Sequence, residues 1–243
     1  MLKKILLIPK LIKFIIVSIR LKNRLKKNKN KNEKNRKEKH QWSKFIINLL
    51  EVDFNKDSSI EYSKDFRLED NLLLISNHRS FLDILIIEQV IQKLNNKNSS
   101  FIAKKELLKI PIVGNIIKSF GTLFIDRGNP RDFITLLKTI KKQLKETEKD
   151  NIFVIFPEGT RDRIINNKGM NSFKEGYLKI AQKNSLNILP IFIEGNTENY
   201  LENIGEQKNP IKVHIFNIIN IENKTNEEIE NKYNEEVNKV INK

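Results

Sequence analysis

The residues best placed to do chemistry are His78 and Asp83, which stand five positions apart. On one continuous helix their side chains would point about 140° apart, at about 100° per residue. They can meet only if the chain bends between them, with His78 in a turn and Asp83 in the first turn of a helix. A carboxylate bonded to one imidazole nitrogen fixes the tautomer and makes the other nitrogen a better base. The spacing therefore indicates an oriented general base.

Ser80 and Asp83 also allow an interpretation without catalysis. Ser-x-x-Asp matches the capping box at the start of a helix, with Ser80 as the N-cap and Asp83 at the third helical position. His78 would then be an ordinary turn residue. Taken alone, the pattern leaves both interpretations open.

The elements that must position these residues follow from the apolar pattern. The apolar run 72–76 precedes the pair and the run 84–87 follows it, which predicts a buried strand, a sharp turn and a helix. Strand and helix patterns then alternate, which predicts an α/β fold with a largely parallel central sheet flanked by helices. We expect strands near 71–76, 99–103, 121–125, 152–156, 187–193 and 211–217, an edge strand over 60–66, and helices near 42–50, 81–95, 105–119, 130–147, 173–184 and 225–241.

Charged residues follow two further predicted strands. Arg127 follows one of them, and Glu158, Gly159 and Arg161 follow the next. Open α/β sheets keep their ligand crevices at the carboxyl ends of the strands, the edge where His78 is expected. Two arginines there could bind a phosphate, because the guanidinium fork matches phosphate geometry. The alternatives are turn chemistry for Glu158-Gly159 and surface ion pairs for the arginines.

Pro190 interrupts the predicted strand near 187–193. Because proline has no amide hydrogen to donate to a ladder, a strand start or a bulge is expected at this position.

Composition excludes several kinds of site. The chain of 243 residues contains no cysteine, which excludes disulfides, thiolate catalysis and Cys-based zinc sites. Its three histidines give no ligand pair at helical spacing, so we expect no metal site.

The positive charge is concentrated at the amino terminus. Residues 1–40 hold 15 Lys and Arg against two acids, a net +13 out of the chain's total of +15. The remainder is nearly neutral. This asymmetry predicts an anionic surface as the partner of the basic segment.

The basic segment has the pattern of a membrane-surface anchor. Residues 1–21 are apolar with lysines threaded through them, and the uncharged piece 14–19 is far shorter than the roughly 20 residues that span a bilayer. An interfacial helix followed by the polybasic run 22–39 fits better. We therefore predict a membrane-anchoring segment over 1–40 and a domain over 41–243, held peripherally at the cytoplasmic face of the cell membrane.

The basic segment has two alternatives to membrane contact. It could be a disordered tail without function. Nucleic acid is disfavoured as a partner, because the run 22–39 contains no aromatic residue to stack on bases and an apolar stretch precedes it.

Four ordered stretches resemble the motifs of the glycerophospholipid acyltransferase family, and most of all its 1-acylglycerol-3-phosphate acyltransferases. They are Asn77–Asp83, Phe124–Arg127, Phe156–Arg161 and Ile188–Pro190, and Phe101–Gly114 resembles the family segment between the first two. The resemblance covers about residues 72–195. It implies a glycerolphosphate acyltransferase-like fold and the transfer of a fatty acyl group from acyl-CoA or acyl carrier protein to lysophosphatidate, which gives phosphatidate.

The resemblance also implies catalytic roles. His78 would be the general base and Asp83 would orient it, while Asn77 and the amides at the start of the following helix would help to stabilise the oxyanion. No protein nucleophile is needed, so Ser80 is interpreted as a cap. The acyl thioester is a co-substrate, and no resident cofactor is implied.

The binding residues carry over from the same motifs. Arg127, Glu158, Gly159 and Arg161 would bind the acceptor, with the arginines on its phosphate. Lys104 is a further candidate for that phosphate.

Three other functions remain to be weighed. The acceptor could be another lysophospholipid or an amino-acid lysolipid, which the motifs do not distinguish. The chain could be a non-catalytic membrane- or nucleic-acid-binding protein, which would leave all four motifs structural. An ester hydrolase is disfavoured because no nucleophile is identifiable.

Overall fold

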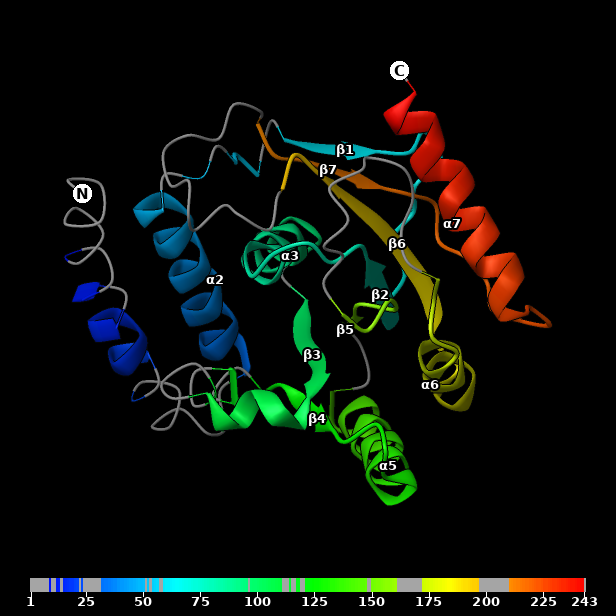
Figure 1. The fold of residues 1–243 in the computed structure, drawn as a ribbon, viewed down its shortest axis with the longest axis horizontal. Helices are drawn as coiled ribbons and strands as arrows, with labels where there is room; N and C mark the ends of the chain where they lie inside the picture. The colour runs from blue at the N-terminus through cyan, green and yellow to red at the C-terminus, as the bar shows by residue number, and fades with distance from the viewer. Residues whose placement is uncertain are drawn as a thin grey trace.

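A computed structural model of the protein describes most of the chain after residue 31 and short pieces before it (Figure 1). The described residues are 9, 12–13, 15–21, 23, 32–50, 52, 54–56, 59–95, 97–110, 114, 117–118, 121–147, 150–160, 172–196 and 210–242. The helices and strands are, in chain order, α2 (Asn32–Leu49), β1 (Ile60–Tyr62), β2 (Leu72–Ser76), α3 (Leu82–Lys93), β3 (Asn98–Lys104), η1 (Lys105–Lys109), β4 (Leu123–Ile125), α5 (Pro130–Thr147), β5 (Asn151–Ile155), α6 (Gly176–Asn184), β6 (Asn187–Glu194), β7 (Lys212–Ile215) and α7 (Asn226–Ile241).

One seven-stranded sheet forms the centre of the described fold, in the order β1-β7-β6-β2-β5-β3-β4. Every neighbouring pair is parallel except β6 and β7. The predicted α/β fold with a largely parallel sheet is therefore confirmed. Because β2 lies between β5 and β6, the residues that follow these three strands emerge side by side at one edge of the sheet.

The central strands are mainly apolar because helices cover both faces of the sheet. In β2, Leu72 and Leu74 belong to the core on one face, while Leu73 and Ile75 belong to the core on the other. Successive strand residues point to opposite faces, so an uninterrupted apolar run is the sequence pattern of a strand buried on both sides.

Helices α2 and α3 cover one face of the sheet, and α5, α6 and α7 cover the other (Figure 1). The last helix packs through Ile229, Tyr233 and Val237, which repeat every four residues and are its buried side chains. Its start is fixed by a capping box, in which Thr225 accepts from the Glu228 amide at 3.2 Å and the Glu228 carboxylate accepts from the Thr225 amide at 2.8 Å.

Most predicted elements match the observed ones, and two of the differences concern a helix and the edge strand. The predicted helix near 105–119 begins as the short 3₁₀ helix η1, and within its remainder residues 114, 117 and 118 are described and helical. The edge strand predicted over 60–66 is shorter, because β1 has only three residues.

Helix α2 begins at Asn32, ten residues before the predicted start at Trp42. The predicted boundary between residues 40 and 41 therefore lies inside a continuous helix. Trp42 is buried, and its indole donates to the Ser18 hydroxyl at 3.2 Å, which joins the amino-terminal segment to the domain. The division into a membrane anchor and an acyltransferase domain stays a prediction.

Pro190 lies within β6 and does not begin it. Its carbonyl accepts from the Phe216 amide at 3.0 Å. Two backbone pairs flank Pro190: Ile191 with Ile215, and Ile188 with Ile219. Between these pairs the segment after β7 contains one residue more than β6 does. The expected start of a strand is therefore wrong, and the bulge lies in the segment opposite Pro190, where the absence of a proline amide costs no ladder hydrogen bond.

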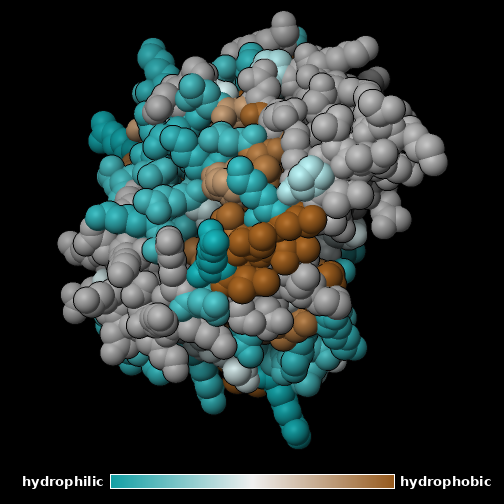
Figure 2. Space-filling model, turned by 90° about the vertical axis from the view of Figure 1, so that its left-hand side faces the viewer, coloured by the Kyte–Doolittle hydropathy of each residue, from teal (hydrophilic) through white to brown (hydrophobic). Residues whose placement is uncertain are grey.

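Apolar side chains gather on the face that carries the amino-terminal segment (Figure 2). In a helical stretch of this segment, Ile12, Ile16 and Ile19 are four and three positions apart and are 52%, 44% and 47% exposed. Leu21 and Ser18 of the same stretch are buried. Among the described residues, no helix combines the length and the apolar character that crossing a membrane requires.

Candidate active site

The turn between β2 and α3 brings His78 and Asp83 into contact. The chain bends directly after β2, so that His78 lies in the turn and Asp83 in the first turn of α3. The His78 Nδ1 and the Asp83 Oδ2 are 2.8 Å apart. The bend that the spacing required is therefore present.

The Asp83 carboxylate accepts hydrogen bonds from more than the imidazole. Its Oδ2 also accepts from the amides of Arg79 at 2.8 Å and Ser80 at 2.9 Å, and its Oδ1 accepts from the Asn196 side-chain amide. The Ser80 hydroxyl in turn accepts from the Leu82 amide at 2.9 Å. The structure makes Phe81 the N-cap residue and Asp83 the second residue of α3, so the predicted capping box with Ser80 as the N-cap is wrong. The Asp83 Oδ2 nevertheless binds both the amides at the helix start and the imidazole, and the catalytic role of the pair stays a prediction.

This environment selects one tautomer of His78. Asp83 is only 1% exposed, and its oxygens accept hydrogen bonds from two backbone amides and a side-chain amide. Because Oδ2 is the acceptor toward both backbone amides, the hydrogen that it shares with the imidazole belongs to Nδ1 of His78. The Nε2 lone pair is then free to act as a base, and the His78 side chain is 18% exposed.

Two residues after β5 fix the position of His78 from other sides. The Phe156 ring stacks on the imidazole with the ring centroids 3.9 Å apart and the planes inclined by 14°. The Glu158 carboxylate accepts from the His78 backbone amide at 3.0 Å and is 2% exposed. Glu158, for which the resemblance implies acceptor binding, therefore lies buried against the backbone of the candidate base.

Asn77 connects the turn to β6. Its side-chain amide donates to the Ile193 carbonyl at 2.9 Å, and its side-chain oxygen accepts from the Ile193 amide at 2.8 Å. Both ends of the Asn77 side chain are thus bound to Ile193, and the predicted oxyanion role stays a prediction. The Arg79 and Ser80 amides donate to Asp83 and are equally engaged.

Asn196 is a site residue that sequence reasoning missed. It follows β6 after Gly195, is 2% exposed, and donates to the outer oxygen of Asp83. The available signal was its place directly after a predicted strand, the position that also singles out His78 and Glu158.

Arg127 and Gly159 are also brought together. The Arg127 guanidinium reaches from the end of β4 and donates to the Gly159 carbonyl at 2.9 Å. Gly159 has a φ of +75°, and a side chain there would collide with the Arg127 guanidinium. Its amide donates to the Phe156 carbonyl at 3.0 Å, which closes the predicted turn. Burial lowers the pKa of Arg127, and the nearby Glu106 carboxylate opposes that effect.

The two remaining predicted binding residues are not joined to this cluster by a described contact. Lys104 ends β3 with an exposed side chain, and no hydrogen bond or ion pair links that side chain to another described residue. Arg161 lies outside the described residues.

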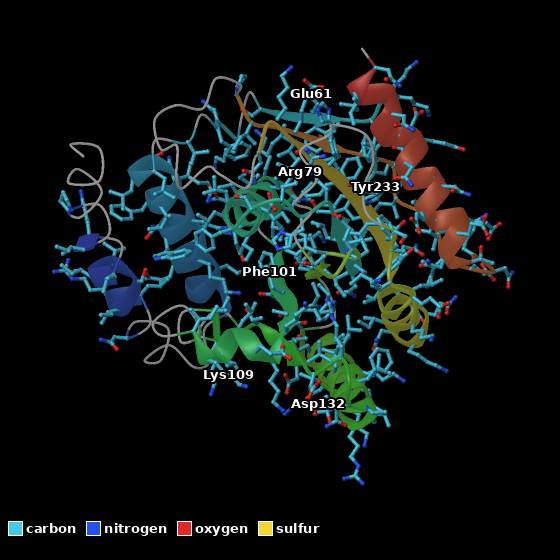
Figure 3. All side chains as sticks on the ribbon, in the orientation of Figure 1. Glu61, Arg79, Phe101, Lys109, Asp132 and Tyr233 are labelled. Carbon is cyan, nitrogen blue, oxygen red and sulfur yellow. The ribbon has the colours of Figure 1, made fainter. Side chains whose placement is uncertain are left out.

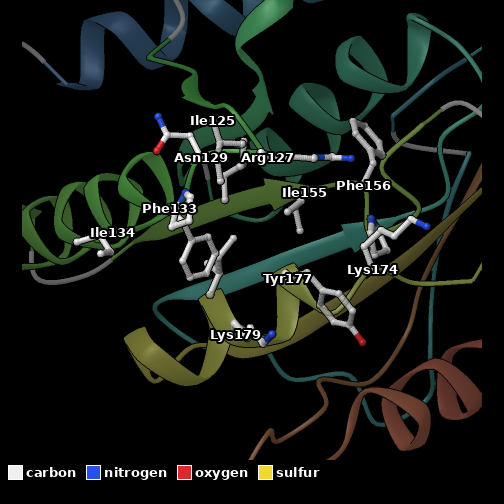
Figure 4. A pocket seen from close by; sticks show the side chains of 16 residues that line it. Ile125, Arg127, Asn129, Phe133, Ile134, Ile155, Phe156, Lys174, Tyr177 and Lys179 are labelled. Carbon is white, nitrogen blue, oxygen red and sulfur yellow. The ribbon is translucent and has the colours of Figure 1, made fainter.

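An apolar pocket of about 630 Å³ opens beside the cluster, between the sheet and helices α5 and α6 (Figure 4). Ile102, Ile125 and Ile155 line it from the strands, and Arg127 lies among the cations at its border. Phe156 both lines the pocket and stacks on His78. One residue of the pocket wall is therefore in contact with the imidazole. A pocket of this kind suits a substrate with an alkyl chain.

Comparison with known proteins gives a consistent result. A family model described as Acyltransferase matches residues 57–194. The 1-acyl-sn-glycerol-3-phosphate acyltransferase of Helicobacter pylori is 36% identical over 121 residues, which cover 50% of this chain and 47% of that protein. The Saccharomyces cerevisiae protein of the same name is 29% identical over 168 residues, covering 66% and 53%. The chain spans about half the length of the curated relatives it matches.

A solved structure supports the fold independently. The crystal structure of the 1-acyl-sn-glycerophosphate acyltransferase from Thermotoga maritima superposes with a TM-score of 0.60 at 23% identity, covering 86% of this chain and 80% of that one. The matched family segment contains the turn with His78 and Asp83, the Arg127 strand end and the Glu158-Gly159 turn. This chain belongs to the Acyltransferase family.

Proposed function

We propose that this protein transfers a fatty acyl group from an acyl thioester to the free hydroxyl of 1-acylglycerol 3-phosphate, which gives phosphatidate. The observation that carries the proposal is the contact between His78 and Asp83, which binds Nδ1 and leaves Nε2 for a substrate hydroxyl. The names of several relatives support lysophosphatidate as the acceptor.

In the proposed reaction His78 is the general base. Its Nε2 takes the proton of the acceptor hydroxyl as the oxygen attacks the thioester carbonyl carbon. The tetrahedral intermediate then loses the thiolate as the carbon–sulfur bond breaks, and the imidazolium returns the proton to that sulfur. Asp83 stabilises the imidazolium, and positioned base catalysis of this kind contributes about 10²–10⁴-fold.

Arg127 is the proposed anchor for the acceptor phosphate. Its guanidinium is held in place by the Gly159 carbonyl, which uses one of its five donors and leaves others for a ligand. Arg161 and Lys104 are the further proposed phosphate ligands. A phosphate bound at Arg127 would lie at the same sheet edge as His78.

The apolar pocket is the proposed site of the donor's acyl chain. Phe156 separates its interior from the His78 ring, so a chain lying in the pocket has its carbonyl end near the base. Acyl-CoA and acyl carrier protein both present such a chain as a thioester.

The amino-terminal segment is the proposed contact with the membrane. Ile12, Ile16 and Ile19 are exposed on one helical stretch, and the segment 1–40 carries a net +13. Apolar contact and attraction to anionic lipids together favour peripheral attachment. We place the enzyme at the cytoplasmic face of the cell membrane, where its two lipid substrates can be met.

The reaction is tested by following free thiol release with lysophosphatidate and either acyl-CoA or acyl carrier protein. Phosphatidate formation is expected, and the Arg127→Lys variant should raise the KM for lysophosphatidate about 10-fold because lysine lacks the planar fork. Arg131→Lys, on the exposed surface of α5, is the matched control. Acylation of another lysolipid with lysophosphatidate ignored would contradict the proposed acceptor, and no thiol release with any lysolipid would contradict the reaction.

The pocket is tested by donor chain length. Ile134 is 52% exposed and lines the pocket, so a larger side chain there should leave the fold intact. We expect Ile134→Trp to reduce turnover of long-chain donors more than that of short-chain donors. Equal losses for all chain lengths would place the acyl chain elsewhere.

Membrane contact is tested by sedimentation with phosphatidylglycerol vesicles. Replacing Ile12, Ile16 and Ile19 by serine should release the protein at moderate salt, while Ile241→Ser, which changes an isoleucine that is 39% exposed on α7, should not. Retained binding of the triple variant would move the proposed contact to another surface.

A further inference from the structure

The last helix of the chain reaches the catalytic turn through one side chain. Tyr233 projects from α7 toward β6 and is 0% exposed (Figure 3). Helix α7 lies beyond residues 57–194, the part of the chain that the family model matches. The ring packs between Phe173 and Phe216, with centroid distances of 5.4 Å and 6.2 Å.

The Tyr233 hydroxyl is bound to the backbone of β6 beside the catalytic turn. It donates to the Ile191 carbonyl of β6 at 2.8 Å. Ile191 is the register partner of Ser76, the last residue of β2 and two residues before His78. Burial and the neighbouring Glu158 carboxylate both raise the pKa of Tyr233, so the hydroxyl keeps the proton that it donates to β6.

This bond adds to the attachment of the Asn77–His78 segment through β6. The Asn77 side chain is bound at both ends to Ile193 of the same strand, and the His78 amide is bound to Glu158. Without the Tyr233 hydroxyl, the Ile191 carbonyl would lose this partner in a place that water does not reach. If β6 shifted in response, the end of β2 that is paired with Ile191 would shift with it, and so would His78.

Helix α7 also binds the segment that leads into α6. The Glu230 carboxylate accepts from the Phe173 amide at 3.2 Å, and the Asn226 side chain donates to the Phe173 carbonyl at 3.4 Å. The next amide, that of Lys174, donates to the Pro157 carbonyl at 2.9 Å. Helix α7 therefore braces both turns that meet at His78, the one after β2 and the one after β5.

We propose that Tyr233 is a positioning residue for the His78 base, and that α7 belongs to the catalytic machinery through its hydroxyl. The role in turnover rests on the proposed acyl transfer. The effect on the geometry of His78 does not.

The test compares Tyr233→Phe with Ser43→Ala in the full-length protein. Ser43 is also 0% exposed, and its hydroxyl likewise donates to one backbone carbonyl, that of His40, while it also accepts from Gln89. Both variants therefore remove one buried hydroxyl that donates to a backbone carbonyl. Ser43 lies where α2 meets α3, away from the turn.

We expect Tyr233→Phe to lower kcat about 10- to 100-fold with less change in KM, since displacement of a reacting group by about 1 Å costs a factor of this order. Ser43→Ala should lower the melting temperature by a similar amount and leave kcat unchanged. Equal kcat in the two variants, measured below both melting transitions, would overturn the proposal.

A second readout needs no substrate. The Nδ1 proton that His78 shares with Asp83 is expected at low field in the proton NMR spectrum. The resonance is assigned by its disappearance in the His78→Ala variant. It should weaken or shift in Tyr233→Phe and stay unchanged in Ser43→Ala. An unchanged resonance in Tyr233→Phe would overturn the proposal even if no acyl transfer were found, so the two failures are distinguishable.

Discussion

Helix α3 carries two carboxylates that each lie beside a histidine, and the two pairs differ in what they can do. At its start, Asp83 contacts His78 at 2.8 Å, and the His78 side chain is 18% exposed. Further along, Glu88 lies 3.5 Å from His40, and both side chains are almost completely buried. A histidine next to a carboxylate is therefore not by itself a mark of catalysis in this fold.

The difference lies in the surroundings of each carboxylate. Asp83 is fixed by the Arg79 and Ser80 amides, and its histidine has a nitrogen that a substrate can reach. Glu88 instead accepts from the Ser99 hydroxyl at 2.5 Å, inside a polar cluster that joins α2, α3 and β3. The first pair has an accessible base, and the second connects packed elements. We therefore expect the first to control turnover and the second to control stability.

The largest expected effect comes from removing each histidine in turn. His78→Ala should reduce turnover by at least about 10²–10⁴-fold with little loss of stability, because the general base is gone while a turn residue adds little to the core. His40→Ala should keep turnover and lower the free energy of unfolding by about 1–3 kcal/mol, because it disturbs a buried polar cluster. Thiol-release kinetics and urea denaturation measure the two quantities. The comparison fails if His40→Ala loses turnover as His78→Ala does.

The carboxylates provide the next test. Asp83→Asn keeps the shape of the side chain but cannot stabilise an imidazolium, so kcat should fall by a large part of the general-base contribution of about 10²–10⁴-fold. Glu88→Gln should leave kcat within about twofold, since its charge does not reach the reacting atoms. Circular dichroism on both variants confirms that each is folded. Comparable losses of kcat would show that the two pairs act as one network.

A smaller effect is expected from the side chains that support each carboxylate. Asn196→Ala removes the donor to the second oxygen of Asp83 and should lower kcat about 10-fold, a fraction of the cost of losing the base itself. Gln89→Ala removes the side chain that donates from α3 to the His40 carbonyl and the Ser43 hydroxyl, and it should affect stability alone. Steady-state kinetics of both variants at one temperature measure the change in kcat. An unaltered kcat in Asn196→Ala would contradict a role of Asn196 in the site.

The smallest effect concerns pH. Burial lowers the pKa of Lys39 from 10.5, although Glu88 opposes the shift, so the folded protein holds this proton less tightly than the unfolded chain does. Unfolding then takes up a proton in the window between the lowered pKa and 10.5, and stability rises with pH across that window. The wild type should gain stability relative to Lys39→Met as pH rises toward 10.5, while turnover at neutral pH stays the same. Urea denaturation of both proteins at several pH values measures the difference, and a constant difference would show that Lys39 does not titrate in this range.

Local patterns were sufficient to predict the elements and the centre of the site. The apolar run of β2 and the Ser80-x-x-Asp83 helix start lie within a few residues of His78, so the bend that pairs His78 with Asp83 could be inferred from the sequence. The start of α2 could not. Its first residues are basic and polar, and only the packing of its second half on α3 identifies the helix.

The contacts that support the site depend on distant parts of the chain. Asn196 binds Asp83 across 113 positions and Tyr233 binds Ile191 across 42, and no periodicity indicates which polar residue will meet which group. The buried position of Glu158 was missed for the same reason. The sequence pattern Pro-Glu-Gly predicts an exposed carboxylate. Glu158 is buried because the turn after the neighbouring strand brings the His78 amide into hydrogen-bond contact with it.

The attachment of Asn77 to Ile193, 116 residues away, has a consequence for the order in which activity appears during folding. His78 and Asp83 are neighbours in sequence and can meet as soon as the turn forms. Ile193 reaches Asn77 only when β6 enters the sheet beside β2, and contacts of such long range form slowly because a large loop must close first. A chain emerging from the ribosome therefore contains the His78–Asp83 pair well before that pair is held rigidly. Recovery of activity during refolding should accordingly lag behind the recovery of helical signal and report the insertion of β6.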